Sequence, residues 1–208
     1  GGGGGSTIVA STLNDLGNSL EASGEYARAE GAHREALAIR RRLLAPDHPE
    51  TGTTLNNLGL VLTRLERFDE AEAMLRESLA IREKALPSPH YATAGTRNNL
   101  ALALARQGRY EESLPHFERA IDEATRALPP GHLMPAALLG NKGDALAKMG
   151  RHAEAEAALL RAYNDLNAAV GPAHRRTRTV AGYLAELCRA SGRTADADRW
   201  AALAQERP

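Results

Sequence analysis

The chain of 208 residues carries 26 basic and 26 acidic residues, so its formal net charge is zero. A neutral chain has no overall field that would attract nucleic acid or an anionic membrane. Its single cysteine excludes a disulfide framework. No apolar run approaches the roughly 18 residues that a membrane span needs. We expect a cytoplasmic protein that binds neither nucleic acid nor membrane.

The first six residues differ in composition from the rest of the chain. Residues 1–6 are five glycines and a serine, which have no apolar surface to bury. This composition predicts a flexible linker, either native or left by cloning. The folded domain is then expected to span residues 7–208.

From residue 7 onward the sequence repeats itself with a constant period. Leu-Asn-Asp-Leu-Gly at 13–17 returns 42 residues later as Leu-Asn-Asn-Leu-Gly at 55–59, and again as Arg-Asn-Asn-Leu-Ala at 97–101. Weaker copies stand at 139–143 and 181–185, without insertion or deletion. A fixed period between 20 and 50 residues is typical of a solenoid, in which each unit buries its apolar face against its neighbours.

Within each repeat the apolar residues follow helical spacing, as Leu13, Leu16 and Leu20 do in the first repeat. Each repeat is therefore predicted to contain two helices, A and B. Glycine follows four of the A helices (Gly24, Gly108, Gly150 and Gly192), where the chain needs a left-handed residue. The expected A/B pairs span about 7–22/25–44, 50–65/68–86, 92–107/110–128, 134–149/152–170 and 175–190/194–205.

Four histidines occupy equivalent positions in the turns before the A helices: His48, His90, His132 and His174. Because they occur once per repeat, they should be separated by about one interhelical distance, whereas zinc ligands lie about 2 Å from one ion. We interpret them as turn-capping residues and predict no metal and no other cofactor. Cys188 falls on the apolar face of the last A helix, and we interpret it as a buried thiol.

No motif of a catalytic site is present. The sequence lacks a phosphate-binding glycine-rich loop with lysine, a zinc-protease helix motif and a nucleophile elbow, so we expect no enzymatic activity. Two arginine runs, at 40–42 and 175–178, could contact RNA in principle. They contain no aromatic residues and the chain is neutral, which argues against nucleic acid as a partner.

The second repeat has a recognisable pattern: Leu-Asn-Asn-Leu-Gly, Arg-Phe-Asp-Glu-Ala-Glu, Ser-Leu-Ala-Ile-Arg-Glu-Lys-Ala-Leu and Pro-Ser-Pro-His. It resembles tetratricopeptide repeats of the kinesin light chain type, whose period is 42 where the ordinary repeat has 34. The resemblance covers residues 7–205. It implies an all-α fold, a right-handed α-solenoid of five helix-turn-helix repeats at about 7–48, 49–90, 91–132, 133–174 and 175–208. In this family the A helices line a concave groove that binds extended peptide segments of partner proteins. Bacterial members carry such arrays as sensor or scaffold regions of larger regulatory proteins.

A second stripe of each A helix should line the groove if the leucines of the first stripe pack inward. In successive repeats this stripe carries an asparagine, then in two repeats a leucine, and then a basic residue. An amide matches the donors and acceptors of a peptide backbone, and arginine forms strong bonds to carboxylates. We therefore predict an acidic protein or peptide partner and these peptide-binding residues: Asn57, Asn99, Asn141, Leu60, Leu102, Arg64, Arg106 and Lys148.

Other interpretations of these residues stay open. The asparagines could serve only helix packing, and basic residues at a helix end could only offset the helix dipole. We favour the dipole role for the arginines just beyond the A helices (Arg67, Arg109, Arg151 and Arg193). The sequence does not match the clamp by which some cochaperones bind the C-terminal tail of a chaperone, because the basic residues of that clamp are missing here. The alternative function is a structural spacer or oligomerisation array without a peptide ligand.

Trp200 gives the last helix two possible roles. It could face a neighbouring molecule, which would allow self-association through the C-terminal end. It could instead fold back over its own helix pair and cap the solenoid.

Overall fold

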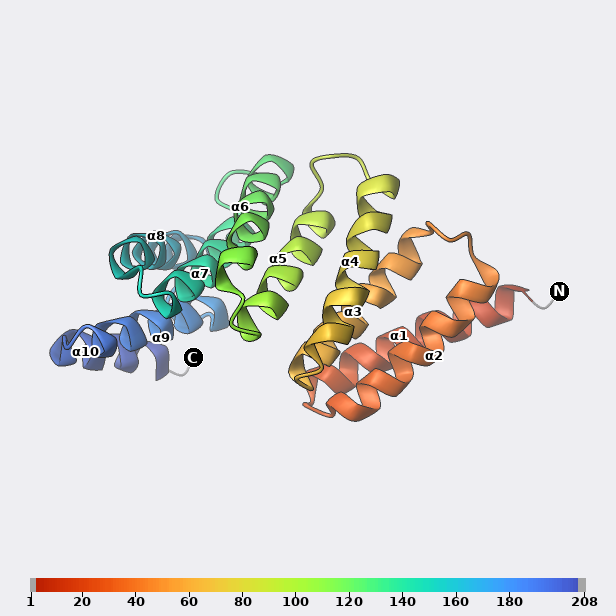
Figure 1. Cartoon of the computed structure of the whole chain (residues 1–208), viewed down its shortest axis with the longest axis horizontal. Coiled ribbons are helices and arrows are strands. Elements are labelled where there is room, and N and C mark those ends of the chain that lie inside the picture. Colours follow the sequence, from red (N-terminus) through yellow and green to blue (C-terminus); the bar gives the residue numbers. More distant parts are fainter. Residues whose placement is uncertain (1–2, 206–208) are drawn as a thin grey trace. The chain divides into compact units, whose positions relative to one another are not determined.

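The computed structural model describes residues 3–205, with only the backbone described for residues 3–5. All regular structure in this range is helical, and consecutive helices are joined by short turns (Figure 1). The helices are α1 (Gly3–Ala22), α2 (Tyr26–Leu43), α3 (Pro49–Arg64), α4 (Phe68–Ala85), α5 (Tyr91–Arg106), α6 (Tyr110–Ala127), α7 (Leu133–Lys148), α8 (His152–Val170), α9 (Arg175–Ala190) and α10 (Thr194–Gln205). The predicted all-α fold of five helix pairs is confirmed. The odd-numbered helices are the A helices and the even-numbered ones the B helices.

The first helix starts earlier than the sequence predicted. Helix α1 begins at Gly3, so residues 3–6 are helical although the sequence analysis assigned them to a flexible linker. Each glycine in a helix costs about 1 kcal/mol relative to alanine. Extension of an existing helix nonetheless gains one hydrogen bond for each residue that is fixed, whereas nucleation fixes several residues for a single bond. Gly1 and Gly2 of the expected linker lie outside the described residues.

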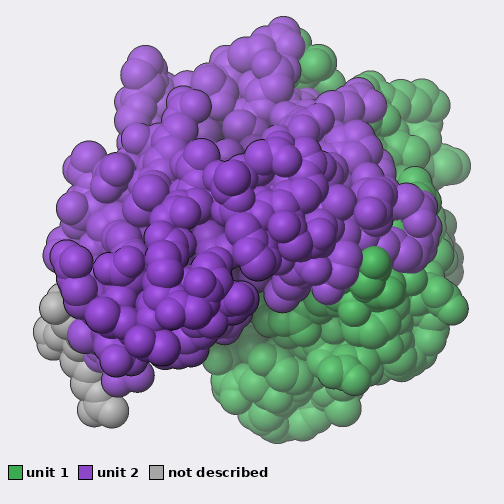
Figure 2. All heavy atoms as spheres, turned by 60° about the vertical axis from the view of Figure 1, so that its left-hand side comes forward, with its two compact units in different colours: residues 1–108 green, residues 109–208 purple. Residues whose placement is uncertain are grey.

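The chain forms two compact units, residues 1–108 and 109–208 (Figure 2). In the first unit, α1 packs against α2, α2 against α3, α3 against α4 and α4 against α5. In the second, α6 packs against α7, α7 against α8, α8 against α9 and α9 against α10. The B helices α2, α4 and α8 therefore lie between their own A helix and the next one, which explains why they are apolar on more than one side.

The turns before the A helices are held by the four repeated histidines. The side chain of His90 is the N-cap of α5, and its Nδ1 accepts a hydrogen bond from the backbone N–H of Ala92 at 3.1 Å. His48, His132 and His174 cap α3, α7 and α9 in the same way. Such a cap satisfies one of the N–H groups that a helix start leaves unpaired. The prediction that these histidines are turn-capping residues is confirmed.

The turns after the A helices need a left-handed backbone. Gly24, Gly108, Gly150 and Gly192 all have positive φ, between 72° and 83°. At the same point of the second repeat stands Glu66, the one non-glycine residue with positive φ in the described part of the chain (φ 60°). The predicted role of the glycines is confirmed, because only glycine adopts this conformation without a steric cost.

Close contact between A and B helices depends on small residues. A Cβ atom added to Gly59 of α3 would lie 2.5 Å from Leu75 Cγ of α4, and one added to Gly143 of α7 would lie 2.7 Å from Leu159 Cγ of α8. Both leucines are fully buried. The glycines thus let a leucine of the B helix reach the backbone of its partner.

One leucine of the predicted inward face is exposed. Leu20 is buried, whereas Leu16 is 47% exposed. Its counterparts 42 and 84 residues later, Leu58 and Leu100, are 0% exposed. The difference arises because a B helix packs on α3 and on α5 from the preceding repeat, and no described element packs on α1 in this way.

Two further features concern the remaining helices. Cys188 is buried, as the sequence predicted, and burial raises the pKa of its thiol. Among the described helices, none combines the length and the apolar character that a membrane crossing requires.

Candidate functional site

The predicted peptide-binding stripe lies on a partly exposed face of α3 and α5 in the first unit. Asn57 and Leu60 of α3 are half-buried, and Asn99 and Leu102 of α5 are half-buried likewise. One turn further along each helix, Arg64 and Arg106 are exposed. Residues three and four apart share a helix face, so each helix presents an amide, an aliphatic side chain and a guanidinium in line.

The asparagines of this stripe belong to a chain of hydrogen-bonded amides across three A helices. Asn99 Nδ2 on α5 donates to Asn56 Oδ1 on α3 at 3.0 Å, and Asn56 Nδ2 donates to Asn57 Oδ1 at 3.2 Å. Asn57 Nδ2 donates to Asn18 Oδ1 on α1 at 2.9 Å and to Asn14 Oδ1 at 3.4 Å. The amides therefore connect adjacent A helices, which is the packing role that the sequence analysis left open.

The amide chain leaves hydrogen-bonding capacity on Asn99. A primary amide has two N–H donors and an oxygen with two lone pairs. Asn99 donates once, to Asn56, and accepts once, from Asn98 Nδ2 at 3.4 Å. One N–H and one lone pair of this half-buried side chain remain for a ligand. Asn57 donates two hydrogen bonds, to Asn14 and Asn18, and its Oδ1 accepts one, from Asn56. The remaining lone pair of Oδ1 can therefore accept a hydrogen bond from a ligand.

Arg64 and Arg106 have no hydrogen bond or ion pair to any described residue. The charge of Arg64 does act on Glu21, near the end of α1. Burial raises the pKa of the Glu21 carboxyl, and the positive charge of Arg64 opposes that shift. The two guanidinium groups thus form an exposed and largely uncompensated positive edge of the first unit.

The corresponding stripe on α7, in the second unit, differs in charge. Asn141 is half-buried like its counterparts. Lys148 is paired with Asp144, one helical turn before it, at 2.7 Å between Nζ and Oδ2. On α9 the stripe continues with Tyr183 and Glu186. The basic member of this stripe thus has an acidic partner, unlike Arg64 and Arg106 of the first unit.

The arginines just beyond the A helices bind glutamates of the B helices. Arg67 pairs with Glu70 at 2.6 Å, and Arg109 and Arg151 bind the glutamate three residues further on in the same way. Arg193 pairs with Glu156 of α8 at 2.8 Å. Hydrogen bonds to these carboxylates raise the pKa of Arg67, Arg151 and Arg193. These four positions are thus occupied by ion pairs at the starts of the B helices.

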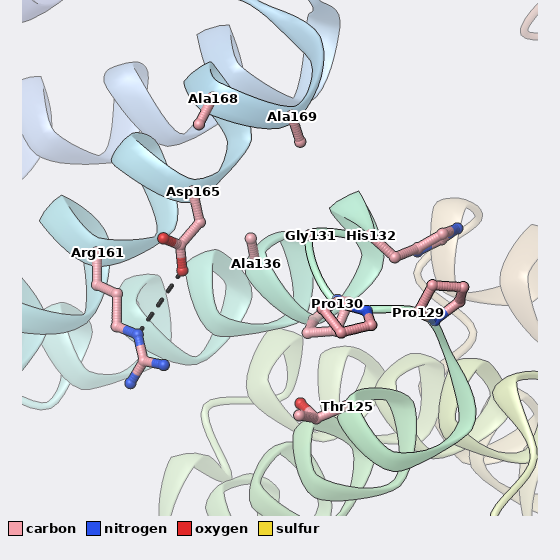
Figure 3. A pocket seen from close by; sticks show the side chains of 11 residues that line it. Thr125, Pro129, Pro130, Gly131, His132, Ala136, Arg161, Asp165, Ala168 and Ala169 are labelled. Atoms are coloured by element: carbon pink, nitrogen blue, oxygen red, sulfur yellow. Dashed lines mark ion pairs between the residues drawn. The ribbon is translucent and has the colours of Figure 1, made fainter.

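A hollow of about 460 Å³ lies in the second unit, between the α6–α7 turn and α8 (Figure 3). Pro129, Pro130 and Ala136 line one side, and Ala168 and Ala169 of α8 line another. Lys84 and Arg126 stand at the position of Ala168 in the two preceding repeats. A small residue thus stands beside the hollow, at a position where the two preceding repeats have a long one. None of the eight predicted peptide-binding residues lines it.

Sequence reasoning missed the buried partners of the stripe. Asn14, Asn56 and Asn98 stand directly before the stripe position in three successive repeats, and each is less than 10% exposed. A signal was present, because an asparagine recurs at this position with the period of 42. A buried polar residue that recurs in this way requires a hydrogen-bond partner in each repeat.

Within residues 3–205, no group of three or more His, Cys, Asp or Glu side chains lies close enough together to hold a metal ion. The chemistry of the candidate site is therefore that of amides, guanidinium groups and two aliphatic side chains.

Several solved structures share the fold. Nearly identical TPR-like repeats of a kinesin light chain from Podosopora anserina have 19% sequence identity and a TM-score of 0.75, over 96% of this chain and 94% of that one. BtubC (BKLC) from P. vanneervenii has 19% identity and a TM-score of 0.76, over 96% and 80%. The Rap conjugation gene regulator of plasmid pLS20, solved with the Phr* peptide, has 14% identity and a TM-score of 0.77, over 92% of this chain and 51% of that one.

The sequence itself shows the family. A search of curated proteins finds no significant match. The sequence profile of the tetratricopeptide repeat, however, matches residues 8–84, 92–167 and 134–207. Together with the helix pairs and the 42-residue period described above, this match over most of the sequence shows that the chain belongs to the tetratricopeptide repeat family.

Proposed function

We propose that this chain is a protein-interaction module that binds an extended, acidic peptide segment of a partner along the stripe of α3 and α5. Asn57 and Asn99 would bind the peptide backbone, Leu60 and Leu102 would contact an apolar side chain, and the two arginines would bind carboxylates. The observation that carries the proposal is the pair Arg64 and Arg106, exposed and without an ion-pair partner among the described residues.

Each group of the stripe has binding capacity that the protein itself does not use. An exposed guanidinium forms a charge-assisted, often bidentate bond with a carboxylate that is brought to it. A spare amide donor and acceptor match the alternating groups of an extended backbone. Among structures of the same fold, the Rap regulator of pLS20 is solved in complex with a peptide. This supports peptide binding as a use of the fold.

Asn141 and Lys148 enter the proposal with a smaller expected contribution. Lys148 already has Asp144 as its partner, so a ligand carboxylate would compete with that bond. We further propose that the module is the sensor or scaffold part of a larger cytoplasmic regulatory protein of bacterial origin. Self-association through the C-terminal end is a separate proposal. Trp200 packs edge-to-face on Tyr163 of α8, with ring centroids 4.9 Å apart, which favours the alternative that it covers its own end.

The test uses a fluorescently labelled library of extended peptides with and without acidic residues. We expect acidic peptides to bind, and Arg64→Ala and Arg106→Ala each to weaken binding by about 1 kcal/mol, about fivefold in Kd. Arg119→Ala is the matched control, because Arg119 of α6 is an exposed arginine that lies outside the stripe and has no ion-pair partner among residues 3–205. Equal losses in all three variants, or no preference for acidic peptides, would refute the proposed site, and no binding of any peptide would favour a structural spacer.

A further inference from the structure

The hollow of about 460 Å³ in the second unit is bounded by the α6–α7 turn, α7 and α8 (Figure 3). Its walls are largely apolar, with prolines of the turn on one side and alanines of α7 and α8 on the other: Pro129, Pro130, Ala136, Ala168 and Ala169. Two charged side chains of α8 also line it, Arg161 and Asp165, which are one helical turn apart. All of these elements lie within the second unit, and α9 and α10 follow them in the chain.

The first unit shows which groups occupy the equivalent place two repeats earlier. The position of Arg161 is held there by Glu77 of α4, which pairs with Arg41 of α2 at 2.6 Å. Thr125, which lines the hollow, stands at the position of Arg41. A threonine cannot replace the guanidinium in an ion pair. The hollow therefore lacks this contact between helices, and it has an arginine in place of the glutamate.

A second ion pair of the first unit has no counterpart at the hollow either. Lys84 of α4 pairs with Asp47 of the α2–α3 turn. Ala168 and Gly131 stand at these two positions, and both line the hollow. Neither residue has a side-chain atom beyond Cβ. The second unit therefore does not fill this place with long side chains.

An apolar contact of the first unit is replaced as well. Ile81 of α4 is 6% exposed and lies against Gly52 of α3, where an added Cβ would be 3.2 Å from Ile81 Cγ2. Asp165 and Ala136 stand at these two positions. The side chain of Asp165 is 56% exposed and turns toward Arg161 (Figure 3). A buried isoleucine is thus replaced by a polar residue that lines the hollow.

Arg161 has N–H groups available for a ligand. Its one ion pair among residues 3–205 is a long contact with Asp165, at 3.7 Å between Nε and Oδ2. Its side chain is 78% exposed, and neither Nη group has a partner in the described part of the chain. A guanidinium can bind a carboxylate through two N–H groups at once. The charge that complements this side of the hollow is therefore negative.

The groups that are missing describe the occupant. A carboxylate would pair with Arg161, and an aliphatic side chain would take the place that Ile81 fills in the first unit. The positions of Arg161 and Asp165 are four residues apart on α8, which is about 6 Å along the helix axis. Alternate side chains of an extended segment lie on one side of it, about 6.6–6.8 Å apart. An acidic and an aliphatic residue that are separated by one position therefore match the hollow.

We propose that this hollow binds an extended segment of a partner protein in which an acidic residue and a leucine-like or isoleucine-like residue are separated by one position. The carboxylate pairs with the Nη groups of Arg161. The aliphatic side chain packs on Ala136, between the walls formed by Pro130 and Ala168. This site lies in the second unit, and it is independent of the peptide-binding stripe on α3 and α5.

A second copy of the chain is a poor occupant. Large apolar residues that are exposed in the described part of the chain are Ile8, Val9, Leu16, Leu43, Tyr91 and Leu160. None of them has an acidic residue two positions away. Only Leu160 has one three or four positions away on its own helix, Glu156, and this glutamate already pairs with Arg193 at 2.8 Å. The chemistry of the hollow therefore favours a different protein.

The probes are short synthetic peptides that differ at two positions with one glycine between them. The first position is Glu, Gln or Lys, and the second is Leu, Ile or Ser. The protein carries Arg64→Ala and Arg106→Ala, so that acidic peptides do not bind along the stripe. We expect the peptides with Glu and an aliphatic residue to bind saturably and to shift the backbone resonances of Ala168 and Ala169 in nuclear magnetic resonance spectra. The peptides with Gln or Ser should bind at least about fivefold more weakly.

Two variants test the role of each side of the hollow. Ala168→Lys places a long side chain in the hollow, as Lys84 is placed in the second repeat, and should abolish binding. Ala157→Lys is its control, because Ala157 is an exposed alanine of the same helix that does not line the hollow. Arg161→Gln should remove the preference for Glu over Gln, whereas Arg189→Gln, at an exposed arginine of α9, should keep it. Thermal unfolding followed by circular dichroism checks that each variant is folded.

The proposal fails if no peptide of the set binds at concentrations up to about 10 mM. It also fails if the peptides with Lys bind best, because Asp165 would then be the binding group, or if binding persists in Ala168→Lys, because the peptides then bind elsewhere. A dimer in sedimentation that Ala168→Lys dissociates would assign the hollow to a second copy. Resonances of residues 206–208 that shift in Ala168→Lys without peptide would assign it to the end of the chain itself.

Discussion

His33 is a polar residue at a position that is apolar in the next three repeats, where Leu75, Phe117 and Leu159 stand. Its side chain is 0% exposed, and neither ring nitrogen has a hydrogen-bond partner in the described part of the chain. The ring lies against Gly17, where an added Cβ would approach it to 2.5 Å. Burial lowers the pKa of His33 to about 4, and the charge of Arg40 acts in the same direction.

We predict that His33 makes the stability of the protein depend on pH. Because the folded-state pKa of about 4 lies below the ordinary 6.5, protonation favours the unfolded chain. The contribution of neutral His33 is complete above about pH 6.5 and is lost as the pH falls toward 4. His33→Leu should remove this dependence. The free energy of unfolding of the variant, relative to that of the wild type, should therefore be about 2 kcal/mol larger at pH 5 than at pH 7. Leucine fits, since Leu75 and Leu159 fill the same position.

Urea unfolding of both proteins at pH 7 and pH 5 measures the difference. The two transitions are compared at equal ionic strength, so that screening of surface charges is the same. A wild type and a His33→Leu variant that lose equal stability between the two pH values would contradict the prediction.

At the scale of the helix, the amide chain sets how α1, α3 and α5 pack. Its central member is Asn56, which is 9% exposed and accepts bonds from Asn99 Nδ2 at 3.0 Å and Thr96 Oγ1 at 3.2 Å. A buried amide with several partners is costly to remove, because each partner is left without its bond. Asn57, by contrast, is half-buried and in reach of water.

We predict that Asn56→Ala destabilises the protein by about 2–3 kcal/mol, and Asn57→Ala by about 1 kcal/mol. The difference arises because the first change removes a buried side chain that accepts bonds from both Asn99 Nδ2 and buried Thr96 Oγ1, whereas water can reach the place of the half-buried Asn57. Chemical denaturation measures both values. The side-chain amide resonances of Asn99 in a nuclear magnetic resonance spectrum should shift in Asn56→Ala. Equal losses in the two variants would show that the chain of amides does not act as described.

For the whole molecule, stability should vary from one helix to another. In a solenoid each repeat contacts only its neighbours, so the local stability follows the local burial. Helix α3 has ten buried residues, whereas the described residues of α10 include one, Ala197. Two further contacts hold α10. Trp200 packs on Tyr163, and Arg178 Nε donates a hydrogen bond to the carbonyl of Ala204 at 3.0 Å.

We predict that hydrogen exchange is fastest in α10 and slowest in α3 and α5, the helices in which most residues are buried. Trp200→Ala should speed exchange in α10 further, because the aromatic contact is lost, and should leave α3 and α5 unchanged. Exchange measured by mass spectrometry on peptides of each helix tests this. Uniform protection along the chain would mean that all the helices unfold together, contrary to the prediction.

The candidate site could be predicted in part. The partial exposure of Asn57, Leu60 and Arg64 follows from helical spacing once the leucines of the same helix are assigned to the core. The amide chain could not be predicted, because a bond such as that from Asn99 to Asn56 depends on the separation and rotation of α5 against α3. The unused hydrogen-bonding groups of Asn99 could not be predicted either, because they depend on how many bonds this side chain makes within the protein.

The sequence by itself determined the period of 42, the ten helices, the capping histidines and the glycines after the A helices. These features are local, since each depends on residues within one or two turns of chain. Only the tertiary structure decided what covers each position. Leu16 and Leu58 occupy the same position of the repeat, and one is exposed while the other is buried. Whether a residue is buried depends on the helix that packs against it as well as on the residue itself, and the repeat pattern does not show whether that helix is present.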